Sequence, residues 1–263
     1  MMYPVPEKSA PPDSIVDTHA HFNDPKFDCY RDELLTELPS FGVSKIINCG
    51  CSDETSLDCI ALSEKYSHIY AAVGYHPCSV QGEINISAIE NMLSHKKVVA
   101  IGEVGLDYYW DKTYIAEQKA AFRLQLELAK RHNIPVIIHD RDAHADTMEI
   151  ILEHRPNGVF HCFSGSVETA RELVKMGMYI GVGGVLTFKN SRKLKEVAAD
   201  IPLDFILLET DAPYLSPEPK RGKTNNSSLI IYVAEALAEI KGITTNEVLT
   251  ATRQNAEKLF HFK

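Results

Sequence analysis

Short apolar runs rich in valine and isoleucine recur along the chain, and each run ends in or beside glycine, aspartate, histidine or proline. Each run is too short for a globular helix and has the composition of a buried strand. Amphipathic stretches with helical spacing lie between the runs. The pattern predicts eight strands, over residues 15–21, 45–50, 70–76, 98–107, 135–140, 158–163, 178–184 and 205–211.

The stretches between the strands predict helices, of which residues 115–132 give the clearest case. There, alanine, leucine and phenylalanine recur among glutamate, glutamine, lysine and arginine. Residues 229–241 and 245–262 predict two more helices after the last strand. Polar residues that favour the start of a helix indicate further helix starts at Ser52, Asp142 and Ser166.

Eight strand candidates that alternate with helix candidates indicate parallel β-α units. The 263 residues suit a closed α/β barrel of the (β/α)₈ TIM type, for which about 250 residues is typical. The main alternative is a doubly wound open sheet, which usually has a glycine-rich phosphate loop after its first strand, where this chain reads DTHAHF. We expect one barrel domain over residues 14–263, preceded by a proline-rich flexible tail over residues 1–13.

Charge and cysteine content narrow the functional class. The formal net charge of −9 argues against a broad basic surface that coats nucleic acid, but it allows a phosphate-bearing substrate in a local pocket. The six cysteines follow no zinc-ribbon or disulfide spacing, which favours reduced thiols in a cytoplasmic protein. No apolar stretch is long enough for a membrane helix, so no membrane association is expected.

Histidines and acids collect at the predicted ends of the strands, which is where a barrel of this type carries its active site. Each residue alone has an ordinary explanation, such as a core histidine or a paired carboxylate. Their convergence on one barrel mouth instead predicts a site for divalent metal ions. The residues concerned are His19, His21, His76, Glu103, His139, His161, Glu209 and Asp211.

Four imidazoles and two carboxylates of this group form a complete ligand set for two ions, namely His19, His21, Glu103, His139, His161 and Asp211. Glu103 is predicted to bridge the ions, because its strand falls between the two histidine pairs in chain order. Asp211 is predicted to bind a metal and to accept the proton of the attacking water. The mixed nitrogen and oxygen set suits Zn²⁺ or Mn²⁺, with Mg²⁺ possible at a more oxygen-rich subsite.

His76 and Arg141 flank the predicted ligands without being needed for the ligand count. The planar guanidinium of Arg141 suits phosphate oxygens, although pairing with Asp142 or Asp107 is an equal alternative. The aromatic residues at 108–110 could stack a base or form a hydrophobic lid. Three cations after the last strand could add to a local basic pocket, namely Lys220, Arg221 and Lys223.

The blocks DTHAHFND, GEVGLDYY, HDRDAH, HCFSG and ETDAPYL, in this order and at these separations, resemble the TatD family of metal-dependent deoxyribonucleases, a branch of the amidohydrolase superfamily. The resemblance runs from about residue 15 to the C-terminus. It implies a (β/α)₈ barrel, the same six metal ligands, substrate contacts at His76 and Arg141, and Glu209 close to the metals. The activity it implies is hydrolysis of DNA phosphodiester bonds, often from 3′ to 5′ on single strands or frayed ends.

One departure from the family lies after the eighth predicted strand. The family commonly reads RGKRNEP there, whereas this chain reads RGKTNNS at residues 221–227. The change bears on substrate preference and leaves the metal set untouched.

Three functions compete at this point: a two-metal nuclease acting on DNA ends, a hydrolase of an amide or an ester such as aminoacyl-tRNA, and a non-catalytic binding barrel. Intact ligand positions favour an enzyme. We expect the nuclease, working as a monomer on DNA held in a local pocket.

Overall fold

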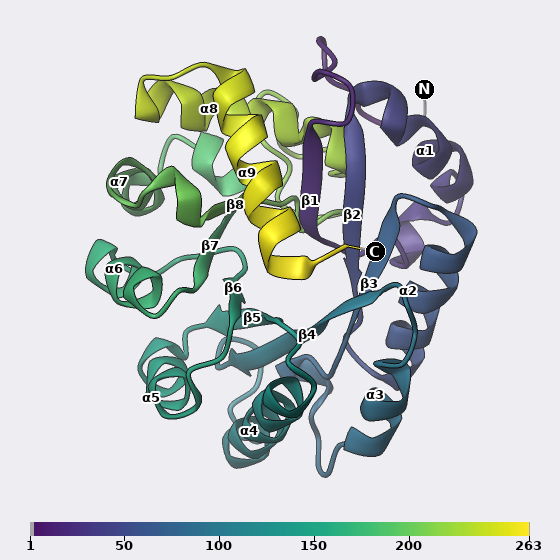
Figure 1. The fold of residues 1–263 in the computed structure, drawn as a ribbon, viewed down its shortest axis with the longest axis vertical. Helices are drawn as coiled ribbons and strands as arrows, with labels where there is room; N and C mark the ends of the chain where they lie inside the picture. Colours follow the sequence, from purple (N-terminus) through teal and green to yellow (C-terminus); the bar gives the residue numbers. More distant parts are fainter. Residues whose placement is uncertain (1–2, 263) are drawn as a thin grey trace.

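Eight parallel strands pair in the order of the sequence in the computed structural model, which describes residues 3–262. The strands curve around a common centre and helices surround them (Figure 1). A parallel bridge between Ala20 and Ala212 brings the chain back to the first strand. The predicted (β/α)₈ barrel is therefore confirmed. The strands are β1 (Ile15–Ala20), β2 (Val43–Cys49), β3 (Ile69–Val73), β4 (Val98–Asp107), β5 (Val136–Arg141), β6 (Gly158–Phe160), β7 (Tyr179–Val182) and β8 (Ile206–Leu208).

Helices follow the strands along most of the chain, and short 3₁₀ helices lie in several connections. Among the residues that the structure describes, no helix is both long and apolar enough to cross a membrane. The α-helices are α1 (Arg31–Glu37), α2 (Asp53–Lys65), α3 (Ile86–Met92), α4 (Ile115–His132), α5 (His144–His154), α6 (Val167–Lys175), α7 (Arg192–Asp200), α8 (Ile230–Lys241) and α9 (Thr245–Phe260).

The helix predictions are confirmed at most positions. Helix α4 spans the predicted residues 115–132, and α8 and α9 begin within one residue of their predicted starts. Ser52 and Ser166 each accept a backbone hydrogen bond at the start of α2 and α6. The predicted start at Asp142 is wrong. Helix α5 begins at His144, because the positive φ of 53° at Asp142 is incompatible with helical backbone.

Several strands are shorter than the sequence predicts. Strand β6 stops at Phe160 and β8 stops at Leu208, whereas the predictions extended to residues 163 and 211. Each of these two strands ends at its last apolar residue, although the His161 N–H still donates to the Ile138 carbonyl and the Glu209 N–H to the Val182 carbonyl. The polar residues that follow therefore lie in the loops at the rim of the barrel.

The apolar core forms two layers. One cluster lies between the strands and the surrounding helices, and a second fills the barrel interior with residues from all eight strands. Leu259 and Phe260 of α9 belong to the interior cluster, and Asn255 Nδ2 donates to the carbonyl oxygens of Leu203 and Ile206 at the start of β8. Helix α9, drawn in yellow across the barrel in Figure 1, therefore closes the end where the strands begin.

The segment predicted as a flexible tail is described from Tyr3 onward, and residues 1 and 2 lie outside the described residues. Tyr3 is buried and its hydroxyl donates to Glu37 Oε2 at 2.7 Å. The backbone N–H of Ala10 donates to the Phe41 carbonyl. The described part of this segment thus contacts the outside of the barrel, and its flexibility stays a prediction.

The first and last strands meet at a seam held by the buried carboxylate of Asp17. Its oxygens accept hydrogen bonds from the Thr210 N–H at 3.0 Å, the Thr210 hydroxyl at 2.7 Å and the Ser227 hydroxyl at 2.7 Å. Burial raises the pKa of Asp17 to about 7, although the hydrogen bonds from Ser227 and Thr210 act to lower it. The seam joins residues 193 positions apart in the sequence.

Candidate metal centre

Glu103 lies at the centre of the cluster, and its two carboxylate oxygens face different histidines. Oε2 lies 3.4 Å from His19 Nε2 and 3.5 Å from His21 Nε2. Oε1 lies 2.7 Å from His139 Nδ1 and 2.8 Å from His161 Nε2. One carboxylate thus stands between two histidine pairs, which is the arrangement that a bridging ligand requires.

These five side chains come from the carboxyl-terminal halves of strands or from the residue just after them. His19, Glu103 and His139 lie in β1, β4 and β5, and His21 and His161 lie one residue beyond β1 and β6. The barrel brings these ends together at one mouth, opposite the end that α9 closes.

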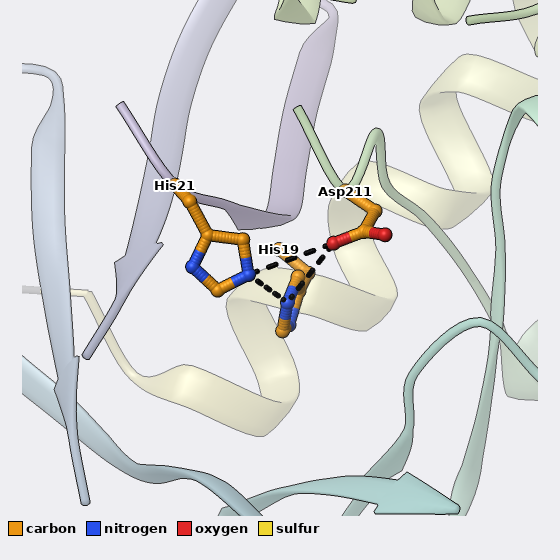
Figure 2. A group of neighbouring side chains, drawn as sticks. All are labelled: His19, His21 and Asp211. Carbon is orange, nitrogen blue, oxygen red and sulfur yellow. Dashed lines mark hydrogen bonds and ion pairs between the residues drawn. The ribbon is translucent and has the colours of Figure 1, made fainter. Parts of the chain in front are cut away.

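His19, His21 and Asp211 form the first group of potential ligands (Figure 2). The Nε2 atoms of the two histidines lie 3.0 Å apart. Oδ1 of Asp211 lies 3.7 Å from His19 Nε2 and 3.5 Å from His21 Nε2. Figure 2 shows the three side chains pointing toward one another, two from the end of β1 and one from the loop after β8.

His139, His161 and His76 lie on the other side of Glu103. His76 and His139 form one group of potential ligands with Glu103, and His161 forms another with Glu103 and His19, on whose ring it stacks with centroids 3.9 Å apart. His139 Nδ1 lies 3.3 Å from His161 Nε2, and His76 Nε2 lies 3.7 Å from Glu103 Oε1. The sequence placed His76 outside the ligand set, as a substrate contact. The structure places it beside that set, within 4.8 Å of ligand atoms of Glu103 and His139.

Burial and mutual contact shift the ionisation of the whole cluster. Burial alone would raise the pKa of Glu103, but the imidazoles of His161 and His19 hold it well below its usual range. Burial would lower the pKa of His21, yet hydrogen bonds with Asp211, Cys51 and Glu103 hold it well above the usual range. Burial would likewise lower the pKa of His161, yet the charges of Glu103 and Glu209 and hydrogen bonds with both hold it well above the usual range. Burial and the nearby His139 lower the pKa of His76 to about 3.

This donor set suits divalent cations. Two ionised carboxylates are surrounded by imidazoles, and some of these imidazoles hold protons that a cation can replace. Within the described residues, the ion-pair partners of Glu103 are all histidines. A buried carboxylate surrounded by imidazoles is suited to bind a metal ion, because imidazole nitrogen and carboxylate oxygen are the usual donors for Zn²⁺ and Mn²⁺.

Glu209, predicted as a residue close to the metals, lies behind His161. Its Oε1 accepts the Cys162 N–H at 2.5 Å and lies 3.6 Å from His161 Nδ1. Its Oε2 is buried and has no hydrogen-bond partner among the described residues. A Cβ atom at Gly181 would lie 2.4 Å from this oxygen, so only glycine leaves room for the carboxylate.

Asp107 is a site residue that the sequence reasoning did not select. It is buried at the end of β4, and its Oδ2 lies 3.0 Å from His139 Nε2. Because His139 Nδ1 faces Glu103, Asp107 fixes the ring from the opposite side. The sequence GEVGLD does indicate this position, because Asp107 and Glu103 are separated by an even number of positions and so face the same side of the strand.

Asp107→Asn is expected to weaken metal binding about 10- to 100-fold. The amide can present an N–H donor to His139 Nε2 where the carboxylate accepted one, so the ring loses its orienting partner. Competition with a coloured chelator measures the affinity, and Asp204→Asn, an exposed aspartate at the closed end of the barrel, is the control. Equal metal affinity in both variants would contradict the assignment.

Arg141 does not pair with Asp142 or Asp107. Its guanidinium carbon instead lies 3.8 Å from the ring centroid of Tyr109 and 5.3 Å from that of Trp110. Both aromatic side chains are exposed, so the structure does not support the alternative of a hydrophobic lid.

The loop with the altered family motif supports the seam. Asn225 Nδ2 donates to the carbonyl oxygens of Thr210 and Tyr214, and Ser227 donates to Asp17. Two of the cations expected in a local basic pocket have other partners. Lys220 lies 3.9 Å from a Glu7 oxygen, and the Arg221 guanidinium lies over the Phe188 ring.

Two cysteines lie close to the cluster, although their spacing in the sequence did not predict a role there. Cys51 Sγ lies within 4.8 Å of ligand atoms of His21 and Glu103, and Cys78 Sγ lies equally close to ligand atoms of His76 and Asp107. Burial raises the pKa of Cys78 to about 12.

Comparisons with known proteins agree with this site. Residues 16–261 match the family described as TatD related DNase. The uncharacterized metal-dependent hydrolase YabD of Bacillus subtilis is 44% identical over 251 residues, which cover 94% of this chain and 98% of YabD. YcfH of Escherichia coli, also an uncharacterized metal-dependent hydrolase, is 33% identical, with 94% of this chain and 96% of YcfH covered.

The crystal structure of YjjV, a TatD homologue from Escherichia coli, superimposes with a TM-score of 0.89 at 34% identity, covering 95% of this chain and 99% of YjjV. A family match across nearly the whole chain and relatives above 30% identity agree with the histidine and carboxylate cluster at the barrel mouth. The chain therefore belongs to the TatD-related DNase family of metal-dependent hydrolases.

Proposed function

We propose that this protein is a deoxyribonuclease that trims single-stranded or frayed DNA ends from 3′ to 5′, with two divalent ions of Zn²⁺, Mn²⁺ or Mg²⁺ in its site. The observation that carries the proposal is the position of Glu103, whose Oε2 faces His19 and His21 and whose Oε1 faces His139 and His161. Two bound ions supply Lewis acidity and lower the pKa of the attacking water.

The residues around these groups then divide the remaining tasks. Asp211 accepts the proton of the attacking water, because its side chain is 19% exposed at the mouth whereas that of Glu103 is 4% exposed. His76 orients a phosphate oxygen. The Cys78 N–H donates to its Nδ1 at 3.1 Å, so the neutral ring carries its proton on Nε2, which faces the site.

The acidic chain favours a substrate held locally at a strand end. Net charge of −9 opposes binding along a duplex, where affinity depends on many phosphate contacts. Arg141 supplies a local cation, because it has no carboxylate partner among the described residues and its N–H groups are available to a phosphate.

A 5′-labelled single strand and a circular single strand of the same composition test the proposal. With metal-stripped protein, adding back Mg²⁺, Mn²⁺ or Zn²⁺ in turn should restore stepwise shortening of the linear strand from its 3′ end. The circular strand should stay intact. Tight metal binding without any DNA cleavage would overturn the proposal and favour an amide or ester substrate.

Arg141→Ala is expected to raise the KM for the linear strand roughly tenfold or more, since a hydrogen bond to a charged group contributes about 1.5–3 kcal/mol. Steady-state kinetics on strands of equal length measure the effect. Arg131→Ala, an exposed arginine on α4, is the matched control and should leave KM unchanged. Equal KM values for the two variants would remove Arg141 from substrate binding.

A further inference from the structure

Two aromatic side chains just after β4 lie open to solvent beside an arginine of β5. Tyr109 is 53% exposed and Trp110 is 69% exposed. Their rings meet edge to face with centroids 4.9 Å apart, and the Arg141 guanidinium lies over the Tyr109 ring. Aromatic side chains have a large apolar area, and leaving two of them in water beside a catalytic site is typical of a binding surface.

This group is fixed to the metal centre by Asp107. Its Oδ1 accepts the backbone N–H of Tyr109 at 2.9 Å and that of Trp110 at 3.3 Å, while its Oδ2 faces His139. The Tyr108 N–H donates to the Arg141 carbonyl at 2.9 Å, so the strand ladder continues to the base of the group. The position of the aromatic rings is thus set by the same carboxylate that orients a potential metal ligand.

The neighbouring tyrosine, Tyr108, points into the protein instead of into solvent. Tyr108 is half-buried against the core, and its hydroxyl donates to Asp146 at 2.7 Å. Its side chain anchors the loop, whereas Tyr109 and Trp110 remain available on the surface.

We propose that Tyr109, Trp110 and Arg141 form an aromatic platform that stacks an unpaired nucleobase of the strand being trimmed, with Arg141 also donating to a flanking phosphate. The inference rests on the proposed function and adds a base-binding subsite to it. A nucleotide supplies both partners that the platform lacks, an aromatic face for the rings and an anion for the guanidinium.

The platform also explains why the enzyme would act on frayed ends. Both faces of a base within a duplex are covered by its neighbours, whereas a terminal or unpaired base has a free face. Stacking on aromatic side chains tolerates every base, so weak sequence preference is expected.

Trp110 is the only tryptophan of the chain, so intrinsic fluorescence reports on the platform directly. The metal-loaded protein would be titrated with a single strand whose 3′-terminal linkages are phosphorothioates, which slow its hydrolysis. A twin strand of equal length and backbone carries abasic sites at the same 3′-terminal positions. The base-bearing strand should quench the fluorescence and bind about 5- to 100-fold more tightly than the twin.

Kinetics of three variants complete the test. Trp110→Ala should raise the KM for a single strand about 5- to 100-fold with little change in kcat. Trp110→Phe, which keeps a stacking face, should largely restore KM. Leu57→Ala is the control, because Leu57 is comparably exposed at 55% but lies on α2.

The two proposals fail separately. Equal affinity for the abasic twin, or an unchanged KM in Trp110→Ala, would overturn the platform while cleavage itself still supports the nuclease. Base-dependent quenching in a protein that cleaves no DNA would support the platform and overturn the nuclease.

Discussion

Glu103→Gln is expected to lower kcat/KM on single-stranded DNA by about 1,000-fold and to reduce the bound metal from two ions to one or none. Glutamine keeps the shape of the side chain but loses its negative charge and one of its two acceptor oxygens. In the native protein those oxygens face His19 and His21 on one side and His139 and His161 on the other. The amide can serve only one of these pairs as an acceptor.

Elemental analysis of the purified variant measures the metal content, and the labelled-strand assay measures the rate. Glu127→Gln changes an exposed glutamate on α4 in the same way and should behave as the native protein does. A Glu103→Gln protein that retains two ions and full activity would exclude the bridging role.

Asp211→Asn is expected to lower kcat about 10²- to 10⁴-fold with a small effect on KM, because an amide cannot accept the proton of the attacking water. The backbone should tolerate the change. Asp211 has a φ of 56°, and asparagine is one of the few residues that adopts this left-handed conformation readily.

Pre-steady-state rates and circular dichroism separate a chemical defect from a folding defect in this variant. Asp58→Asn, an exposed aspartate on α2, is the matched control. An unchanged kcat in Asp211→Asn would assign proton transfer to another group.

The strand pattern was sufficient to predict the barrel and the convergence of histidines and carboxylates at one of its ends. A two-residue period places His19 and His21 on one side of a strand, and their Nε2 atoms do meet at 3.0 Å. Asp17 has the same phase but contacts Thr210 and Ser227 at the seam. A register shift in β1 between Asp17 and Ala20 separates its environment from that of the histidines, and no local pattern announces such a shift.

The side-chain contacts between neighbouring strands could not be predicted from the sequence for a similar reason. Asp107 has the phase of Glu103, yet the residue it faces depends on how β4 pairs with β5, where the register shifts between Ile101 and Val104. That register sets Asp107 opposite Arg141, and from it follow both the contact with His139 and the placement of the aromatic platform.

The seam between β1 and β8 has a consequence for how the protein holds together. His19 lies in the first strand and His21 just after it, whereas Asp211 lies in the loop after the last strand. A divalent ion held by these three side chains would tie the first strand to the loop after the last one. Its binding energy would then add to the stability of the closed barrel, by about 2.7 kcal/mol at a free concentration 100 times the Kd.

This linkage works in both directions. Opening the seam would separate the ligands and release the ion, and losing the ion would weaken the joint that Asp17 shares with Thr210 and Ser227. The ion proposed to take part in hydrolysis would then also link the first strand to the loop after the last one. The metal-free protein would be both inactive and easier to unfold from this seam.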